Sequence, residues 1–216
     1  MTRTIVVLTA GLTVPSSTRM LGDQIADAVQ AAVRGRGEAV RFEYVEVREL
    51  AQDLASFMTS GGVATPRLAG VREQVSAADG VVAVTPVFSA SFSGLFKMFL
   101  DALDQDALNA MPVLIAATAG SARHSLVLDH AMRPLFSHLR AVVLPTGVFA
   151  ATEDFGGTGL EDRIRRAAAE LANAVVVSGN DHVAGFAPDP STRRRTSGNE
   201  LAPVGDFADL LRGHAG

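Results

Sequence analysis

The segment GVVAVTPVFSASFSGLFKMFLD, residues 80–101, decides the fold of this chain. Residues 80–85 are a short apolar run, typical of a strand that is buried on both faces of a parallel sheet. The apolar residues that follow predict a buried helix over 92–104. Between them, Pro86 fixes the direction of the chain, and three serines follow within five positions, Ser89, Ser91 and Ser93. A plain strand-to-helix connection needs one capping residue, so the excess of hydroxyls predicts a loop that binds a ligand.

Short apolar runs alternate with helical patterns along the rest of the chain. The predicted strands are residues 4–10, 39–47, 80–85, 112–118 and 141–150. The predicted helices are residues 18–34, 48–78 with a loop at its Gly-Gly pair, 92–104, 123–139 and 159–178. This alternation predicts an α/β fold, in which helices cover both faces of a five-stranded parallel sheet.

Composition narrows the classes of function. The chain has 216 residues, 48% of them hydrophobic, which is enough to bury a sizeable core. Its net charge of −4 provides no basic field, so neither a nucleic acid nor a membrane is expected as a partner. Cysteine is absent, which excludes disulfides and thiolate catalysis and suits a reducing cytoplasm. The sequence therefore predicts a cytoplasmic protein.

The amino-acid composition changes near the end of the sequence. Residues 1–180 predict one domain, whereas residues 181–216 are rich in proline, glycine, serine and charge and predict a polar, flexible tail. Arg193, Arg194 and Arg195 in this tail are interpreted as solvated side chains. Phe207, Leu210 and Leu211 are candidates for docking against a partner subunit.

In an open parallel sheet, ligands bind beyond the carboxyl ends of the strands. The first predicted strand is followed by GLTVPSSTRML, residues 11–21, in which Ser16, Ser17 and Thr18 stand where a helix should begin. Hydroxyls and free amides at a helix N-terminus bind phosphate, although one of these residues could simply be an N-cap. The loop has neither the P-loop pattern nor the dinucleotide fingerprint. A monophosphate is therefore favoured over a pyrophosphate.

Two further loops follow the third and fourth predicted strands. In the first, Gly94 allows the backbone to approach a flat ligand closely. In the second, TAGSARHS, residues 118–125, His124 either approaches a ring or merely starts a helix. His130 and His138 do not share a helical face with it, so no metal site is predicted. One phosphate loop and two ring loops suit flavin mononucleotide (FMN) on a flavodoxin-like three-layer sandwich of strand order 2-1-3-4-5.

Two segments carry a resemblance to a known family. TPVFSASFSGLFKMFLD, residues 85–101, resembles the TPxYxxSxxGxxKxxxD segment of NADPH-dependent FMN reductases, and residues 116–141 resemble their next loop and helix. The likeness covers roughly residues 4–178. It implies a flavodoxin-like fold, FMN bound at a subunit interface in a homodimer or homotetramer, and hydride transfer from NADPH to the flavin N5. The most similar members supply reduced FMN to a flavin-dependent monooxygenase.

The resemblance also implies which residues bind FMN, and it implies no catalytic side chain, because the flavin carries the chemistry. The phosphate loop is matched by Ser16, Ser17 and Thr18, with Arg19 beside it. The ring loops are matched by Thr85, Pro86, Val87, Phe88, Ser91, Gly94, Thr118, Gly120, Ser121 and His124. Phe88 stands where tyrosine is usual, and the first loop lacks an arginine that many relatives carry. NADH is therefore an alternative to NADPH.

Other functions remain open at this point. One alternative is an enzyme that retains FMN and reduces quinones or azo dyes. Another is a flavodoxin-type electron carrier, which the absence of tryptophan, the single Tyr44 and the modest charge disfavour. A non-catalytic interaction domain would leave the three hydroxyl-rich loops without a purpose.

Overall fold

A computed structural model of the chain describes residues 2–177 and 195–200. Arg193, Arg194, Phe207, Leu210 and Leu211 lie outside the described residues. The strands are β1 (Thr2–Thr9), β2 (Ala39–Glu46), β3 (Gly80–Phe88), β4 (Ser91–Phe92), β5 (Pro112–Ala119), β6 (Val142–Val143) and β7 (Val148–Ala151). The α-helices are α1 (Ser17–Arg34), α2 (Ala51–Thr59), α3 (Pro66–Ala77), α4 (Gly94–Asp101), α5 (Arg133–His138) and α6 (Thr158–Val177).

The strand order confirms the flavodoxin-like sheet. Along the main path the order is β2-β1-β3-β5-β6, and all of these neighbours pair in parallel. The sheet has seven strands rather than the five expected. One addition is β4, which turns back against β3, and the other arises because the expected strand over 141–150 is divided into β6 and β7 around Pro145. Proline cannot donate to a ladder, which accounts for the interruption.

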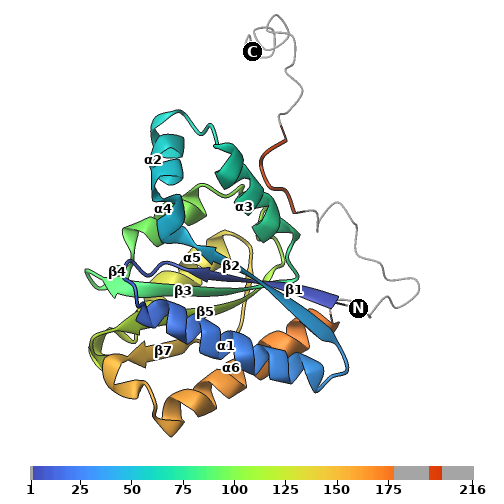
Figure 1. The fold of residues 1–216 in the computed structure, drawn as a ribbon, viewed down its shortest axis with the longest axis vertical. Coiled ribbons are helices and arrows are strands. Elements are labelled where there is room, and N and C mark those ends of the chain that lie inside the picture. Colours follow the sequence, from blue (N-terminus) through green and yellow to red (C-terminus); the bar gives the residue numbers. More distant parts are fainter. Residues whose placement is uncertain (1, 178–194, 201–216) are drawn as a thin grey trace, which may run out of the picture.

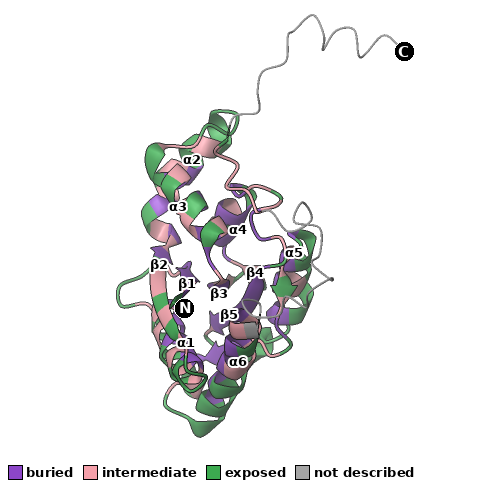
Figure 2. Cartoon of the chain, turned by 90° about the vertical axis from the view of Figure 1, so that its right-hand side faces the viewer, coloured by how far each residue is buried: buried purple, intermediate pink, exposed green. Residues whose placement is uncertain are grey.

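Helices cover both faces of the sheet, as a three-layer sandwich requires (Figure 1). On one face, α1 and α6 pack on β-strand side chains such as Ile5, Val82 and Leu114. On the other face, α2, α3, α4 and α5 enclose a second core around Phe96 and Phe136. Figure 2 shows the buried residues in the middle layer and on the inner sides of the helices. No helix in the described part of the chain is long and apolar enough to cross a bilayer.

The helix expected over 123–139 is broken into three pieces. They are a 3₁₀ turn, η2 (Ala122–His124), a π-helical turn, η3 (Leu128–Met132), and α5. Pro134 lies at the start of α5 and has no amide to donate to the carbonyl of His130, so the regular ladder fails at this point. The break lies directly after the third predicted ligand loop.

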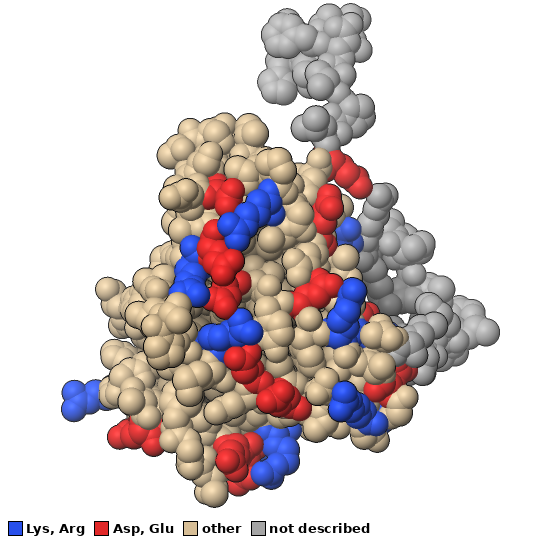
Figure 3. All heavy atoms as spheres, in the orientation of Figure 1, with Lys and Arg blue, Asp and Glu red and all other residues tan. Residues whose placement is uncertain are grey.

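Strand β2 forms one edge of the sheet and is lined with charge. Arg41 forms an ion pair with Glu43 at 2.8 Å and donates a hydrogen bond to the hydroxyl of Thr4 on β1 at 3.3 Å. Both signs of charge are interspersed over the face of the molecule drawn in Figure 3. This face therefore offers no extended single-sign field for a polyanion.

The turn between β3 and β4 places two non-glycine residues in the left-handed region. Val87 pairs with Phe92 and Phe88 with Ser91, which leaves Ser89 (φ 49°) and Ala90 (φ 63°) as a two-residue turn. Such turns prefer Asn-Gly or Gly-Gly, because each left-handed L-residue costs roughly 1–2 kcal/mol. The hairpin is therefore held in place by its pairing and by the packing of its strands.

Substituting glycine for Ala90 should stabilise the protein. Ala90→Gly removes the left-handed penalty and is expected to raise the free energy of unfolding by about 1 kcal/mol, which corresponds to about 2–4 °C in melting temperature. The matched control is Ala31→Gly on the exposed side of α1, where the same change should destabilise by about 1 kcal/mol. Thermal denaturation should show a higher melting temperature for Ala90→Gly and a lower one for Ala31→Gly. An equal change in the two melting temperatures would contradict the strain at Ala90.

Candidate functional site

The loop between β1 and α1 is shaped by one glycine. Ser16 is the N-cap of α1, and its hydroxyl accepts a hydrogen bond from the amide of Arg19 at 3.2 Å. A Cβ at Gly11 would collide with Ser16 Oγ and would lie 3.2 Å from Thr18 Cβ. The cap can therefore form only because residue 11 has no side chain.

The first turn of α1 has the groups that bind an anion. Ser16 satisfies the amide of Arg19 with its hydroxyl and the amide of Met20 with its carbonyl, at 3.0 Å. Within the described residues, the amides of Ser17 and Thr18 have no acceptor in the protein. These two amides, the helix dipole and the exposed hydroxyl of Ser17 form a donor set that fits a phosphate group.

Arg19 is turned away from this donor set. Its guanidinium forms ion pairs with Asp23 at 2.8 Å and with Glu46 at 2.7 Å, and it lies 4.3 Å from the centre of the Tyr44 ring. Burial alone would lower the pKa of Arg19, but the hydrogen bonds and charges of Asp23 and Glu46 more than offset it, so this pKa is raised. Arg19 therefore contributes positive charge near the phosphate loop, while its Nε and Nη1 are each held by a carboxylate.

Two predicted ligand residues meet each other inside the protein. The hydroxyls of Thr18 and Thr118 lie 3.0 Å apart, and both residues are buried. This contact joins the first turn of α1 to the end of β5, residues 100 positions apart in the chain. The two hydroxyls therefore fix the phosphate loop relative to the second ring loop.

Thr85 has a similar internal role. Its side chain is completely buried, accepts a hydrogen bond from the amide of Ser93 at 3.0 Å and donates to the carbonyl of Pro86 at 3.0 Å. Ser93 in turn caps α4 by accepting from the amide of Phe96 at 3.2 Å. These bonds close the β4 hairpin onto the start of α4. They hold the first ring loop in one conformation.

The residues that remain accessible in this loop are mainly apolar. Pro86 and Val87 are half-buried, and Phe88 is 45% exposed. Ser91 is half-buried, and a Cβ at Gly94 would meet nothing within 4 Å, so there is space beside the backbone. An exposed aromatic edge beside open backbone suits contact with a planar ring.

The loop after β5 is more open. Gly120 and His124 are exposed, Ser121 is half-buried, and a Cβ at Gly120 would also meet nothing within 4 Å. In the described part of the chain, no cluster of three or more His, Asp, Glu or Cys side chains could hold a metal ion. The loop therefore offers backbone and hydroxyl groups, with the imidazole of His124 at its rim.

Sequence reasoning missed two kinds of residue at this edge. One is Glu46, which binds Arg19 and also Arg48 at 3.0 Å and so ties the end of β2 to the phosphate loop. The other is a set of exposed apolar side chains on the first loop and directly after the third, Leu12, Val14 and Leu126. These three residues could have been identified from the sequence, because an apolar residue in a hydrophilic loop is unusual.

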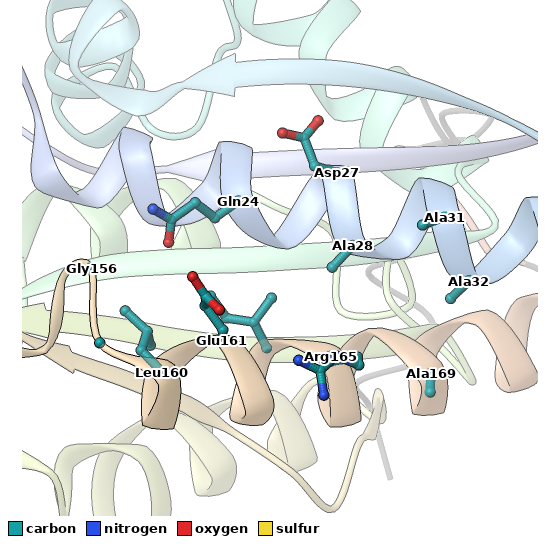
Figure 4. Close-up of a pocket in the computed structure, with 12 residues that line it drawn as sticks. Gln24, Asp27, Ala28, Ala31, Ala32, Gly156, Leu160, Glu161, Arg165 and Ala169 are labelled. Carbon is teal, nitrogen blue, oxygen red and sulfur yellow. The ribbon is translucent and has the colours of Figure 1, made fainter.

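A separate hollow of about 550 Å³ lies between α1 and α6 (Figure 4). Its walls are mostly small or apolar, with Gln24 and Asp27 from α1 and Glu161 and Arg165 from α6 as polar groups. None of the residues predicted to bind FMN contributes to its lining. The hollow is thus a groove between the two helices, and it is distinct from the edge where the three loops lie.

Comparison with known proteins identifies relatives of this chain. The family model described as NADPH-dependent FMN reductase matches residues 3–156. The NADH-dependent FMN reductase SfnE of Pseudomonas putida is 38% identical over 172 residues, which are 76% of this chain and 88% of that protein. An oxidoreductase of Corynebacterium diphtheriae, solved by X-ray crystallography, is 57% identical with a TM-score of 0.79, over 82% of this chain and 98% of that one. The apo NADH:FMN oxidoreductase EMOB is 26% identical with a TM-score of 0.67, over 89% and 95%.

Proposed function

Because this chain belongs to the NADPH-dependent FMN reductase family, we propose that it transfers hydride from a reduced nicotinamide nucleotide to FMN. The observation that carries the proposal is the donor set at the N-terminus of α1, beside two loops whose conformations are fixed by buried threonine hydroxyls. A flavin monophosphate needs such a combination of an anion site and a pre-formed ring site.

The residues present fit FMN. The amides of Ser17 and Thr18 would hold the phosphate, and the segment from Pro86 to Phe88 with the backbone at Gly120 would contact the ring system. When bound, the flavin supplies the hydride acceptor at N5. The protein contributes orientation, because the Thr18–Thr118 contact sets the distance between the phosphate and ring loops. The apolar residues of the hairpin would lie against a bound ring and would limit its contact with water.

The choice of nicotinamide nucleotide is the finer part of the proposal. NADPH is the proposed donor, in line with the family, and NADH is the alternative that the P. putida relative is named for. Arg19 is engaged with two carboxylates, so it is not a ready partner for the extra phosphate of NADPH. A modest preference between the two nucleotides is therefore expected, measured as the ratio of their kcat/KM values.

The physiological role is also proposed. Reduced FMN would pass to a flavin-dependent monooxygenase, and the enzyme would act in the cytoplasm as a homodimer or homotetramer, as in the reductases that the sequence resembles. Residues 1–180 are the proposed catalytic domain. An enzyme that retains its FMN and reduces quinones or azo dyes is the second candidate, because the ring loops suit a prosthetic group equally well.

The direct experiment is a steady-state assay on the purified full chain. With FMN and NADPH or NADH, oxidation of the nucleotide at 340 nm should proceed at roughly 1–10³ s⁻¹. A protein that leaves gel filtration colourless but turns over added FMN acts on flavin as a substrate. A protein that stays yellow is the FMN-retaining reductase. Absence of turnover with both nucleotides would reject the reductase assignment.

A further inference from the structure

Residues 195–200, within the predicted polar tail, pack against the folded domain. The side chain of Arg195 donates to the carbonyls of Ser76 and Ala78 at the C-terminal end of α3, and it contacts Met111 Sδ at 3.3 Å. A cation there satisfies carbonyls that the helix leaves free and complements its dipole. The interpretation of Arg195 as a solvated side chain is therefore wrong. Its pKa is lowered by burial, against the attraction of Asp79.

Two more side chains of this segment have partners on the domain. The hydroxyl of Thr196 donates to Asp104 Oδ1 at 2.6 Å. The carboxamide of Asn199 donates to the carbonyl of Ala69 at 2.8 Å and to Glu73 Oε1 at 3.1 Å, both on α3. The segment thus bridges α3 and the connection between α4 and β5.

Among residues 195–200, Gly198 tolerates a side chain least. Its φ of +69° lies in the left-handed region, and a Cβ there would collide with Arg72 Nη2 and lie 2.9 Å from Asp104 Cβ. Arg72 itself is buried, and its Nε has no hydrogen-bond partner among the described residues. Burial lowers the pKa of Arg72, while Asp104 acts in the opposite direction. The close backbone at Gly198 therefore covers a buried guanidinium.

We propose that α3, Asp104 and Met111 form a peptide-docking surface, and that residues 195–200 are a strap which occupies it in the same chain. The surface selects a guanidinium, a hydroxyl donor, a residue without a side chain and a carboxamide, in that order along the strap. Ala78 lies two residues before β3 and Met111 one residue before β5, so the strap lies at the amino-terminal edge of the sheet (Figure 1). Residues 195–200 are thus held at the opposite end of the strands from their carboxyl ends, where FMN would bind.

The test uses the full chain and trypsin, which cleaves after Arg195 when the strap is released. Gly198→Ala should raise the cleavage rate at the Arg195–Thr196 bond at least tenfold, because cleavage follows the population of the open state. The matched control is Gly70→Ala on α3, where a Cβ meets nothing within 4 Å and cleavage should match the wild type. Thr196→Val keeps the trypsin site, removes one donor and should raise the rate several-fold.

Three results would overturn the proposal. They are unchanged cleavage in both Gly198→Ala and Thr196→Val, an equal increase in Gly70→Ala, and a wild-type rate that falls as protein concentration rises, which would indicate docking between copies. The strap is remote from the carboxyl ends of the strands, where FMN would bind. FMN affinity should therefore be equal in the wild type and in the three variants. The cleavage readout needs no flavin, so failure of the reductase assignment would leave this test unaffected.

Discussion

Gly11→Ala is expected to weaken FMN binding by about thirtyfold to several hundredfold. The new methyl group would occupy the position of Ser16 Oγ, so the cap on α1 must break and the first turn must shift. Loss of an N-cap costs about 1 kcal/mol, and overpacking of a close contact costs roughly 1–3 kcal/mol. Since each 1.4 kcal/mol is about a factor of ten in affinity, the combined effect gives this range.

Titration calorimetry with FMN measures this effect directly. Ser16→Ala separates its two components, because it removes the cap without adding a methyl group and should cost about tenfold at most. Gly159→Ala is the matched control, since a Cβ there, in the first turn of α6, meets nothing within 4 Å. If Gly11→Ala binds FMN as tightly as the control does, the phosphate site is not at the N-terminus of α1.

The second large effect is expected at the buried Thr18–Thr118 pair. Thr18→Val should lower the free energy of unfolding by about 1–3 kcal/mol, because it leaves the Thr118 hydroxyl buried without its partner. Thr118→Val should do the same from the other side. The double variant replaces both hydroxyls by methyl groups of similar shape, and it should cost much less than the sum of the single changes.

Urea denaturation of the four proteins completes this double-mutant cycle. The expected coupling between the two positions is on the order of 1 kcal/mol or more. FMN affinity should fall in both single variants, because the contact sets the spacing between the phosphate loop and the second ring loop. Strict additivity in stability, with unchanged affinity, would show that the two hydroxyls do not act as a pair.

Much of the fold could be predicted from the sequence, because the central strands are uniform apolar runs and the helices have regular stripes. The β3–β4 hairpin could not, since Ser89 and Ala90 lack the glycine that usually marks such a turn. The break in the helix before α5 was also missed, although Pro134 is visible in the sequence. There the apolar spacing continues across the break and conceals it.

The positions of the candidate loops after β1, β3 and β5 could be predicted from the sequence, whereas the direction of each side chain could not. Thr18, Thr85 and Thr118 were predicted to face a ligand, and their hydroxyls instead bind partners inside the protein. The partners lie 100 and 8 positions away, so only the folded chain reveals them. Likewise, Arg19 is held by Glu46, 27 positions along the chain. Long-range pairing of polar groups leaves no periodic signal in a sequence.

The charged outer strand β2 has a consequence for self-association. If two copies paired through their β2 edges, the two β2 backbones would have to form hydrogen bonds with each other. The Arg41–Glu43 ion pairs of both copies would then lose their hydration. An unpaired edge strand that carries charged side chains resists pairing with the edge strand of a second copy. Any assembly of this protein is therefore expected to leave the β2 edge solvated.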